Sequence, residues 1–242
     1  MKIKLIFLLL VCSLFIFVNC TKEVKERIKP EILDDEMVQY STKQNFLDRN
    51  YEGILAIKKL GAYGDFGLGT FNGLDGEMVY LDNVCYQIKA NGNVNVASSE
   101  EHAPYSTIKH FKIDKSATIG NVDSLSEFFE KIKACIKDTN QFAAVKIEGK
   151  FSYLKTRSIH KQNKPFPSLE EVVANQVVSE FKDIEGTLVG FYFPKLYDKI
   201  NFTEFHFHFI SKDKKKGGHL LDCKVTNALA VFDFTKELRI IL

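Results

Sequence analysis

The sequence predicts a mixed α and β protein (α+β / mixed α/β) with two β-sheet-based halves and a few flanking helices. From Tyr51 onward the chain reads as a succession of short strand-like segments punctuated by glycines. Two segments with the apolar spacing of amphipathic helices interrupt these strands. With 242 residues, 45% of them hydrophobic, the chain is long enough to bury a sizeable core. Strand-like segments dominate its C-terminal half.

Residues 1–19 are predicted to be a signal peptide. Lys2 and Lys4 supply positive charge, and the apolar stretch at residues 5–18 is shorter than the ~20 residues that span a bilayer. Cys20 follows as in a bacterial lipoprotein signal. We therefore expect lipidation of Cys20 and an exported protein, membrane-anchored only through this lipid and facing the extracytoplasmic side. The alternative is an ordinary signal peptide cut near the same place, with Cys20 incidental.

Residues 20–45 are predicted to be the lipidated N-terminus and a linker, because charges alternate and large apolar residues are few. Residues 46–242 then form the folded domain, with a mixed β-sheet N-terminal half and a smaller β-rich C-terminal half. No cysteine of this domain lies in a CxxC motif, which excludes a four-cysteine zinc site and predicts buried thiols at Cys85, Cys135 and Cys223.

The first part of the domain, at residues 61–88, is predicted to contain turns and a pair of strands. The glycines of residues 61–76 indicate turns and close packing rather than a phosphate-binding loop, because no Lys-Ser/Thr pair follows them. Residues 78–88 alternate apolar and polar side chains well enough for two strands that turn at Asp82 and Asn83.

Two helices are predicted from Ser-x-x-Glu capping boxes, in which side chains satisfy free amide groups at the helix start. The first box is Ser124 with Glu127, and the second is Ser168 with Glu171. The expected apolar faces are Leu125, Phe128, Phe129, Ile132, Cys135 and Ile136 for the first helix, and Val172, Val173 and Val177 for the second.

The remaining segments are predicted to be strands. The expected ranges are 143–156, as a strand pair bent at Gly149, and then 186–193, 202–210, 220–225 and 227–242.

Three of the six histidines lie within residues 206–219. Side chains on a strand alternate between faces, so His206 and His208 must point to the same side, where both imidazoles can reach one ion. The charged, glycine-containing segment at residues 211–218 predicts a hairpin, which would bring His219 alongside them. The sequence therefore predicts a metal site with three imidazole ligands.

Three imidazoles with an open coordination position are typical of catalytic zinc, whereas structural zinc sites have four protein ligands. The alternative is that each histidine is an ordinary core or surface residue. A formal net charge of +2 is too small to attract nucleic acid, so we expect no such partner.

Several motifs resemble the α-acetolactate decarboxylase family. The likeness extends from about residue 45 onward, in the order and spacing of the family. The motifs are GTFNGLDGE at residues 69–77, KFSYLKTR at 150–157, GTLVGF at 186–191, HFHFIS at 206–211 and GGHLLD at 217–222.

The resemblance implies a function. Family members bind zinc through these three histidines and convert 2-acetolactate to acetoin and carbon dioxide through a metal-stabilised enediolate. Arg157 matches a substrate-contacting arginine, Glu77 matches an active-site glutamate able to deliver a proton, and Thr70 matches a pocket-lining position. The resemblance further implies Zn²⁺ as cofactor, carboxy-lyase activity in acetoin biosynthesis, and a homodimer.

One departure from the family concerns the C-terminus. Family chains continue beyond the strand that here ends at Leu242, and a glutamate in that tail also reaches the metal site. The alternative function is therefore a catalytically impaired or inactive zinc-binding lipoprotein of the same fold that has lost the tail. A cupin-like metal enzyme is a third interpretation, and the family context of Glu77 and Arg157 argues against it.

Overall fold

The computed structural model describes residues 35–242. The predicted signal peptide (residues 1–19), the predicted lipidation site Cys20 and residues 20–34 of the predicted linker lie outside the described residues. Within the described part, strands predominate and the three α-helices have only five, nine and six residues. The expected β-sheet basis is confirmed, and helices contribute less than a mixed α and β class implies. No helix among these residues is long and apolar enough to cross a membrane.

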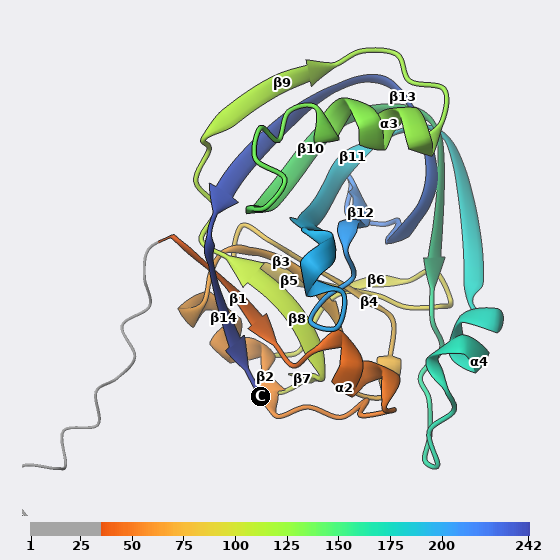
Figure 1. Ribbon diagram of the computed structural model, residues 1–242. Coiled ribbons are helices and arrows are strands. Elements are labelled where there is room, and N and C mark those ends of the chain that lie inside the picture. Colours follow the sequence, from red (N-terminus) through yellow and green to blue (C-terminus); the bar gives the residue numbers. More distant parts are fainter. Residues whose placement is uncertain (1–34) are drawn as a thin grey trace, which may run out of the picture. The chain divides into compact units, whose positions relative to one another are not determined.

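Seven strands form the first sheet (Figure 1). Their order is β14 (Glu237–Ile241), β1 (Glu36–Tyr40), β8 (Tyr105–Lys109), β3 (Phe66–Thr70), β4 (Glu77–Leu81), β5 (Val84–Ile88) and β6 (Val94–Val96). Strand β1 pairs in parallel with β14, whereas the other pairs are antiparallel. Strand β14, at the C-terminal end of the described residues, therefore belongs to the sheet of the N-terminal strands. The two sheets do not correspond to two consecutive halves of the sequence.

The hairpin between β4 and β5 turns as predicted at Asp82 and Asn83. Both residues have positive φ, 52° and 64°. A two-residue turn of this kind needs left-handed backbone at both central positions, and Asp and Asn adopt it more readily than most residues. The hairpin matters for the site because its first residue is Glu77.

Five strands form the second sheet, in the order β10 (Phe142–Ser158), β11 (Val177–Phe193), β12 (Glu204–Ser211), β13 (Gly217–Thr235) and β9 (Lys115–Ile119). An additional pairing of β10 with β13 closes the sheet on itself. Strand β13 includes the strand predicted at residues 220–225 and the first part of the one predicted at 227–242. The last part of that second predicted strand forms the separate strand β14.

The prediction of a strand pair bent at Gly149 was wrong, because β10 is one strand of 17 residues. Gly149 pairs with Gly186 on one side and Ala228 on the other. An added Cβ would lie 2.4 Å from the Cβ of Ala228. This glycine therefore permits a close approach of neighbouring strands instead of forming a turn.

The helices begin where the capping residues predicted. In α3 (Leu125–Lys133) the Ser124 hydroxyl accepts a hydrogen bond from the Glu127 amide, and in α4 (Leu169–Ala174) both capping-box hydrogen bonds of Ser168 and Glu171 form. Figure 1 shows α3 over the five-stranded sheet and α4 at the end of the β10–β11 pair. Val177 begins β11 rather than lying on α4.

The predicted linker extended to residue 45, and its described part is instead folded. Residues 36–40 form β1, all buried, and α2 (Lys43–Leu47) follows. Met37 and Val38 pack in the core although three acidic residues directly precede them in the sequence. The linker was predicted from local composition. The strand that forms there is instead stabilised by pairing with its two neighbours, β14 and β8, which local composition does not indicate.

An apolar core joins the two sheets. It includes Phe66, Leu68 and Val79 from the first sheet, with Val189 and Phe191 from the second. A two-stranded sheet and three 3-10 helices complete the described fold. The sheet pairs β2 (Leu55–Ala56) with β7 (His102–Ala103), and the helices are η1 (Ile57–Ala62), η2 (Asn72–Leu74) and η3 (Lys195–Tyr197).

Candidate metal centre

Strand β12 presents two imidazoles on one face. His206 and His208 are two residues apart and both are buried, and Phe207 and Phe209 fill the core on the opposite face. This is the alternation expected of a strand in the middle of a sheet. The aromatic side chains hold the strand against β11 and α3, so that the two imidazoles have a rigid support.

The hairpin from β12 to β13 brings the third imidazole to the same place. His208 lies directly opposite His219 in the antiparallel register. The amide of Ser211 donates to the carbonyl of Lys216, which closes the turn as the charged segment predicted. Gly218 has φ 139°, and a Cβ there would lie 2.5 Å from the carbonyl oxygen of Arg157, so a glycine is required for this close approach.

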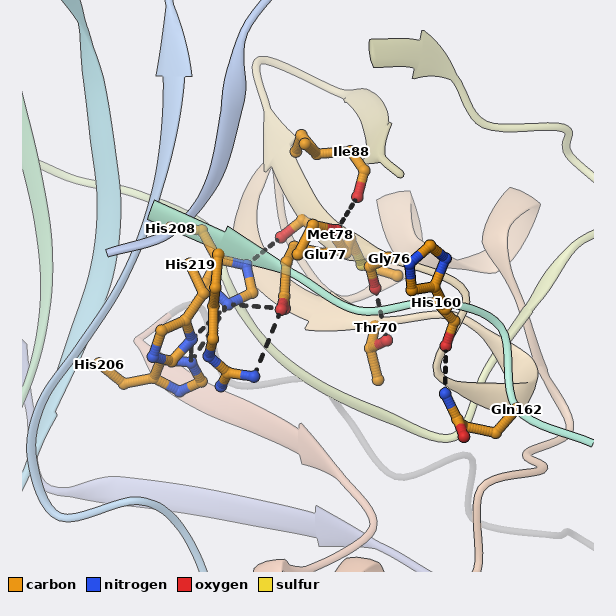
Figure 2. Close-up of polar contacts among 12 residues, drawn as sticks. Thr70, Gly76, Glu77, Met78, Ile88, His160, Gln162, His206, His208 and His219 are labelled. Atoms are coloured by element: carbon orange, nitrogen blue, oxygen red, sulfur yellow. Dashed lines mark hydrogen bonds and ion pairs between the residues drawn. The ribbon is translucent and has the colours of Figure 1, made fainter. Parts of the chain in front are cut away.

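The three imidazoles offer one nitrogen each to a common point (Figure 2). His206 Nε2 lies 3.2 Å from His208 Nε2 and 3.2 Å from His219 Nδ1, and the last two atoms are 3.3 Å apart. Ligand nitrogens of a tetrahedral zinc site with Zn–N bonds of ~2.0–2.1 Å are separated by about 3.3 Å. The donor set and its spacing therefore fit a zinc-sized transition-metal ion.

Hydrogen bonding and burial favour neutral imidazoles with lone pairs directed inward. His208 Nδ1 lies 2.7 Å from the carbonyl oxygen of Met78, which can only accept, so Nδ1 carries the proton and Nε2 is left to bind metal. Burial lowers the pKa of all three histidines, most for His206 and His219, where neighbouring imidazoles and Arg157 lower it further. A neutral imidazole is the form that binds metal.

Glu77 and Arg157 lie beside the three imidazoles. Glu77 Oε2 is 3.4 Å from His208 Nε2, and Glu77 Oε1 is 3.8 Å from Arg157 Nη1. Glu77 Oε1 and Arg157 Nη1 are both buried and have no hydrogen-bond partner among the described residues. Buried polar atoms of this kind are normally satisfied, so a carboxylate and a guanidinium facing one pocket indicate a polar ligand.

Thr70 lies next to Glu77 in the β3–β4 register and also lines the pocket. Its hydroxyl donates a 2.7 Å hydrogen bond to the carbonyl oxygen of Gly76. This bond uses the only proton of the hydroxyl, so Thr70 fixes the turn before Glu77 and has only lone pairs left for a ligand. Figure 2 shows Glu77 directed toward His208, whereas His160 points away from the three imidazoles.

A cavity of about 310 Å³ opens in front of the imidazoles. Its polar end is made by the histidines, Glu77 and Arg157, and its other end is apolar. The apolar wall comes from segments that are far apart in sequence: Phe46, Leu74, Tyr105, Ile159, Leu169, Val173 and Phe202. This wall was not predictable from the sequence, because apolar residues that line a cavity have the same pattern as residues of a closed core. The capping box predicted α4 but not which way Leu169 and Val173 point.

These features define a class of protein. Three neutral imidazoles line a cavity, next to a carboxylate and a guanidinium that each have one buried atom without a hydrogen bond among the described residues. A metal ion bound there would be reachable by a small molecule, which is the arrangement of metal-dependent enzymes rather than of closed structural sites.

Comparison with known proteins identifies the family. Residues 37–242 match the family "Alpha-acetolactate decarboxylase", and the chain belongs to this family, as its motifs predicted. The alpha-acetolactate decarboxylase of Methanosarcina mazei is 38% identical over 220 residues, which are 90% of this chain and 76% of the relative. That of Brevibacillus brevis is 38% identical over 192 residues, 79% of this chain and 67% of the relative.

Solved structures show the same fold. The crystal structure of alpha-acetolactate decarboxylase from Bacillus subtilis strain 168 has a TM-score of 0.84 at 29% sequence identity, covering 86% of this chain and 89% of that chain. A Staphylococcus aureus protein described as similar to alpha-acetolactate decarboxylase has a TM-score of 0.83 at 28% identity, covering 85% and 88%.

Proposed function

We propose that the protein catalyses zinc-dependent decarboxylation of 2-acetolactate to acetoin and carbon dioxide. The observation that carries the proposal is the set of three imidazole nitrogens, 3.2–3.3 Å apart, at the polar end of a cavity. Membership of a family whose relatives are named for this activity supports it. Glu77 and Arg157, whose facing atoms are buried and have no hydrogen-bond partner among the described residues, supply the remaining polar groups that the reaction needs.

In this proposal Arg157 binds the substrate carboxylate. Its guanidinium is planar and permanently charged, and Arg157 lines the cavity beside the three histidines. The bond between the carboxylate carbon and the adjacent carbon breaks, and its electron pair passes toward the neighbouring ketone oxygen as carbon dioxide leaves. A zinc ion held by His206, His208 and His219 would supply Lewis-acid stabilisation of the negative charge that develops.

Glu77 completes the reaction by supplying a proton. Its carboxyl group lies between His208 and Arg157, on one side of the cavity. A proton delivered from this side to the carbon that lost carbon dioxide gives acetoin, and delivery to one face sets the configuration of the product. The apolar wall keeps water away from the same carbon, which limits protonation by solvent.

The test is acetoin formation from racemic 2-acetolactate by the chain that begins at Cys20. We expect one zinc ion per chain, and acetoin formation far above an enzyme-free control. Treatment with EDTA should abolish activity and zinc should restore it. His206→Ala should remove both metal and activity, whereas His102→Ala, outside the pocket, should change neither.

Two results would speak against the proposal. No bound metal in the wild-type chain would contradict the metal centre itself. Bound metal at one ion per chain without acetoin would instead leave a metal-binding protein of the same fold that lacks turnover.

We also propose that the protein is exported and anchored through Cys20, on the basis of the charged and apolar pattern that precedes this residue. Metabolic labelling with a radioactive fatty acid should mark the wild-type chain in the membrane fraction. Cys20→Ser should lose the label. An unlabelled wild-type chain in the medium would support a cleaved, ordinary signal peptide instead.

A further inference from the structure

The connection between β11 and β12, residues 194–203, is tied to the other sheet by one buried amide. Asn201 is 2% exposed, and its side chain makes four hydrogen bonds. Its Nδ2 donates to Gln39 Oε1 at 2.7 Å and to Thr107 Oγ1 at 3.1 Å. Its Oδ1 accepts from the Tyr105 hydroxyl at 2.6 Å and from the Phe202 amide at 2.6 Å. These bonds use both protons and both lone pairs of the amide.

The partners of Asn201 belong to the seven-stranded sheet. Gln39 lies on β1, Tyr105 and Thr107 lie on β8, and all three are buried. Gln39 Nε2 also donates to the carbonyl oxygen of Ile200 at 2.6 Å, so the backbone before Asn201 is held as well. A buried network in which every group is paired holds a loop in one position more firmly than apolar contact alone.

The next residue, Phe202, contacts a predicted metal ligand. The centre of its ring lies 5.3 Å from that of His206 in an edge-to-face arrangement, and 6.0 Å from the ring of Tyr105. The ammonium of Lys43 lies 5.5 Å from the same ring. Phe202 therefore lies between the Tyr105 ring of β8 and the imidazole of His206, and it lines the cavity.

His206 needs such a contact more than His208 does. The carbonyl of Met78 orients His208 through its Nδ1. For His206, the hydrogen-bonding contacts within the described chain are those of Nε2 with the other two imidazoles, and none of them involves Nδ1. Metal-binding histidines are normally oriented by a hydrogen bond to the second ring nitrogen, whereas the contact that can orient His206 here is its edge-to-face packing with the Phe202 ring.

We propose that Asn201 is a positioning residue for the metal site. Its network fixes the backbone at residues 200–202, and the Phe202 ring then holds the imidazole of His206 at the angle that metal binding requires. This inference rests on the proposed function, because it needs the three-histidine site to bind metal. It adds that the seven-stranded sheet controls the geometry of a ligand on the five-stranded sheet.

Cobalt binding tests the proposal, because the visible absorption of Co²⁺ reports the arrangement of its ligands as well as its affinity. The variants are Asn201→Ala, Phe202→Leu, which keeps an apolar side chain but removes the ring, and Phe202→Tyr, which keeps the ring. Tyr192→Phe serves as the control, since it keeps the ring and removes one partly buried hydrogen bond, to the Thr139 carbonyl, and neither residue lines the cavity.

We expect Asn201→Ala and Phe202→Leu to weaken cobalt binding by about tenfold or more and to shift the cobalt bands. Phe202→Tyr and Tyr192→Phe should both keep the wild-type cobalt spectrum. A wild-type spectrum and affinity in both Asn201→Ala and Phe202→Leu, whatever their thermal stability, would overturn the positioning role. Failure of the wild-type chain to bind cobalt would instead overturn the proposed metal site.

Discussion

His206, His208 and His219 are held by different means, although they form one site. A backbone carbonyl orients His208, an aromatic ring contacts His206, and the pairing of β12 with β13 places His219. The position of the three side chains was predictable, because strand alternation and a short hairpin are local properties. The groups that orient them were not, since Met78 and Phe202 reach the site only through the packing of two sheets.

Glu77 and Arg157 illustrate the same limit at the scale of single residues. Their place in the site was implied by family motifs, whereas nothing in their local sequence distinguishes them from surface residues. They meet because Glu77 begins β4 in one sheet while Arg157 lies opposite His219 in the other. A contact of this range depends on tertiary packing and cannot be deduced from spacing.

The proton-donor role of Glu77 gives a prediction for Glu77→Gln. The amide keeps the shape of the side chain but cannot deliver a proton, so the turnover number should fall by about 10²–10⁴-fold. Protonation would then come from solvent, and the residual acetoin should approach a racemic mixture by chiral gas chromatography. Zinc content should stay near one ion per chain, because the three imidazoles remain. Residual acetoin with the wild-type enantiomeric ratio would show that another group delivers the proton.

At the scale of elements, the packing of β11 against β12 supports the site on the face of β12 opposite its two histidines. Gly190 on β11 faces the ring of Phe207, which lies between the two histidines of β12 and points to the opposite side. An added Cβ at Gly190 would lie 2.1 Å from Phe207 Cδ1 and 2.3 Å from Cε1. The ring is enclosed by other aromatic side chains, including Phe128 and Phe129, and has little room to move.

Gly190→Ala is therefore expected to shift β12 and both of its histidines. Overpacking of this kind costs about 1–3 kcal/mol, so the free energy of unfolding measured in urea should fall by that amount. Zinc affinity, measured by competition with a chelator, should fall as well. Gly120→Ala is the matched control, because a Cβ there meets nothing within 4 Å. Normal stability and zinc affinity in Gly190→Ala would mean that the Phe207 ring adjusts without moving its strand.

Elements differed in how well the sequence predicted them. The β4–β5 hairpin and the starts of α3 and α4 were predicted correctly, because turn and capping residues act within a few positions. The long strand β10 was divided at Gly149, since a glycine in a strand can signal either a turn or a close approach. Which of the two applies depends on Ala228, nearly eighty positions away.

At the scale of the whole described part of the chain, polar contacts outside the metal site also reach across the sheets, in addition to the apolar core. One example is the Asn201 network. Another is a buried ion pair between Lys109 on β8 and Asp233 on β13, with Nζ and Oδ1 3.2 Å apart and both side chains at most 1% exposed. Lys109 also pairs with the exposed Asp35 at 2.8 Å. The pairing of β14 with β1 and these cross-links were not predictable, because each joins residues that are far apart in the sequence.

The charge state of Asp233 makes this cross-link sensitive to pH. Burial raises the pKa of Asp233 to about 6, with a smaller contribution from nearby Asp114, although the Lys112 amide and Lys109 oppose the rise. A pKa raised above the unfolded value of about 3.8 means that the group contributes stability at low pH. That contribution is lost as the pH rises through about 6, and Lys109 then compensates the buried negative charge.

Lys109→Met should therefore destabilise the protein much more at pH 8 than at pH 5. At pH 8 it leaves a buried carboxylate unpaired, which costs about 3–5 kcal/mol, whereas at pH 5 Asp233 can stay protonated and neutral. The measurement is the difference in free energy of unfolding from wild type in urea, at each pH in the same buffer. In the double variant Lys109→Met, Asp233→Asn this pH dependence should disappear, because no titrating carboxyl group remains at that position. An equal loss at both pH values in the single variant would show that Lys109 acts through packing of its side chain rather than through its charge.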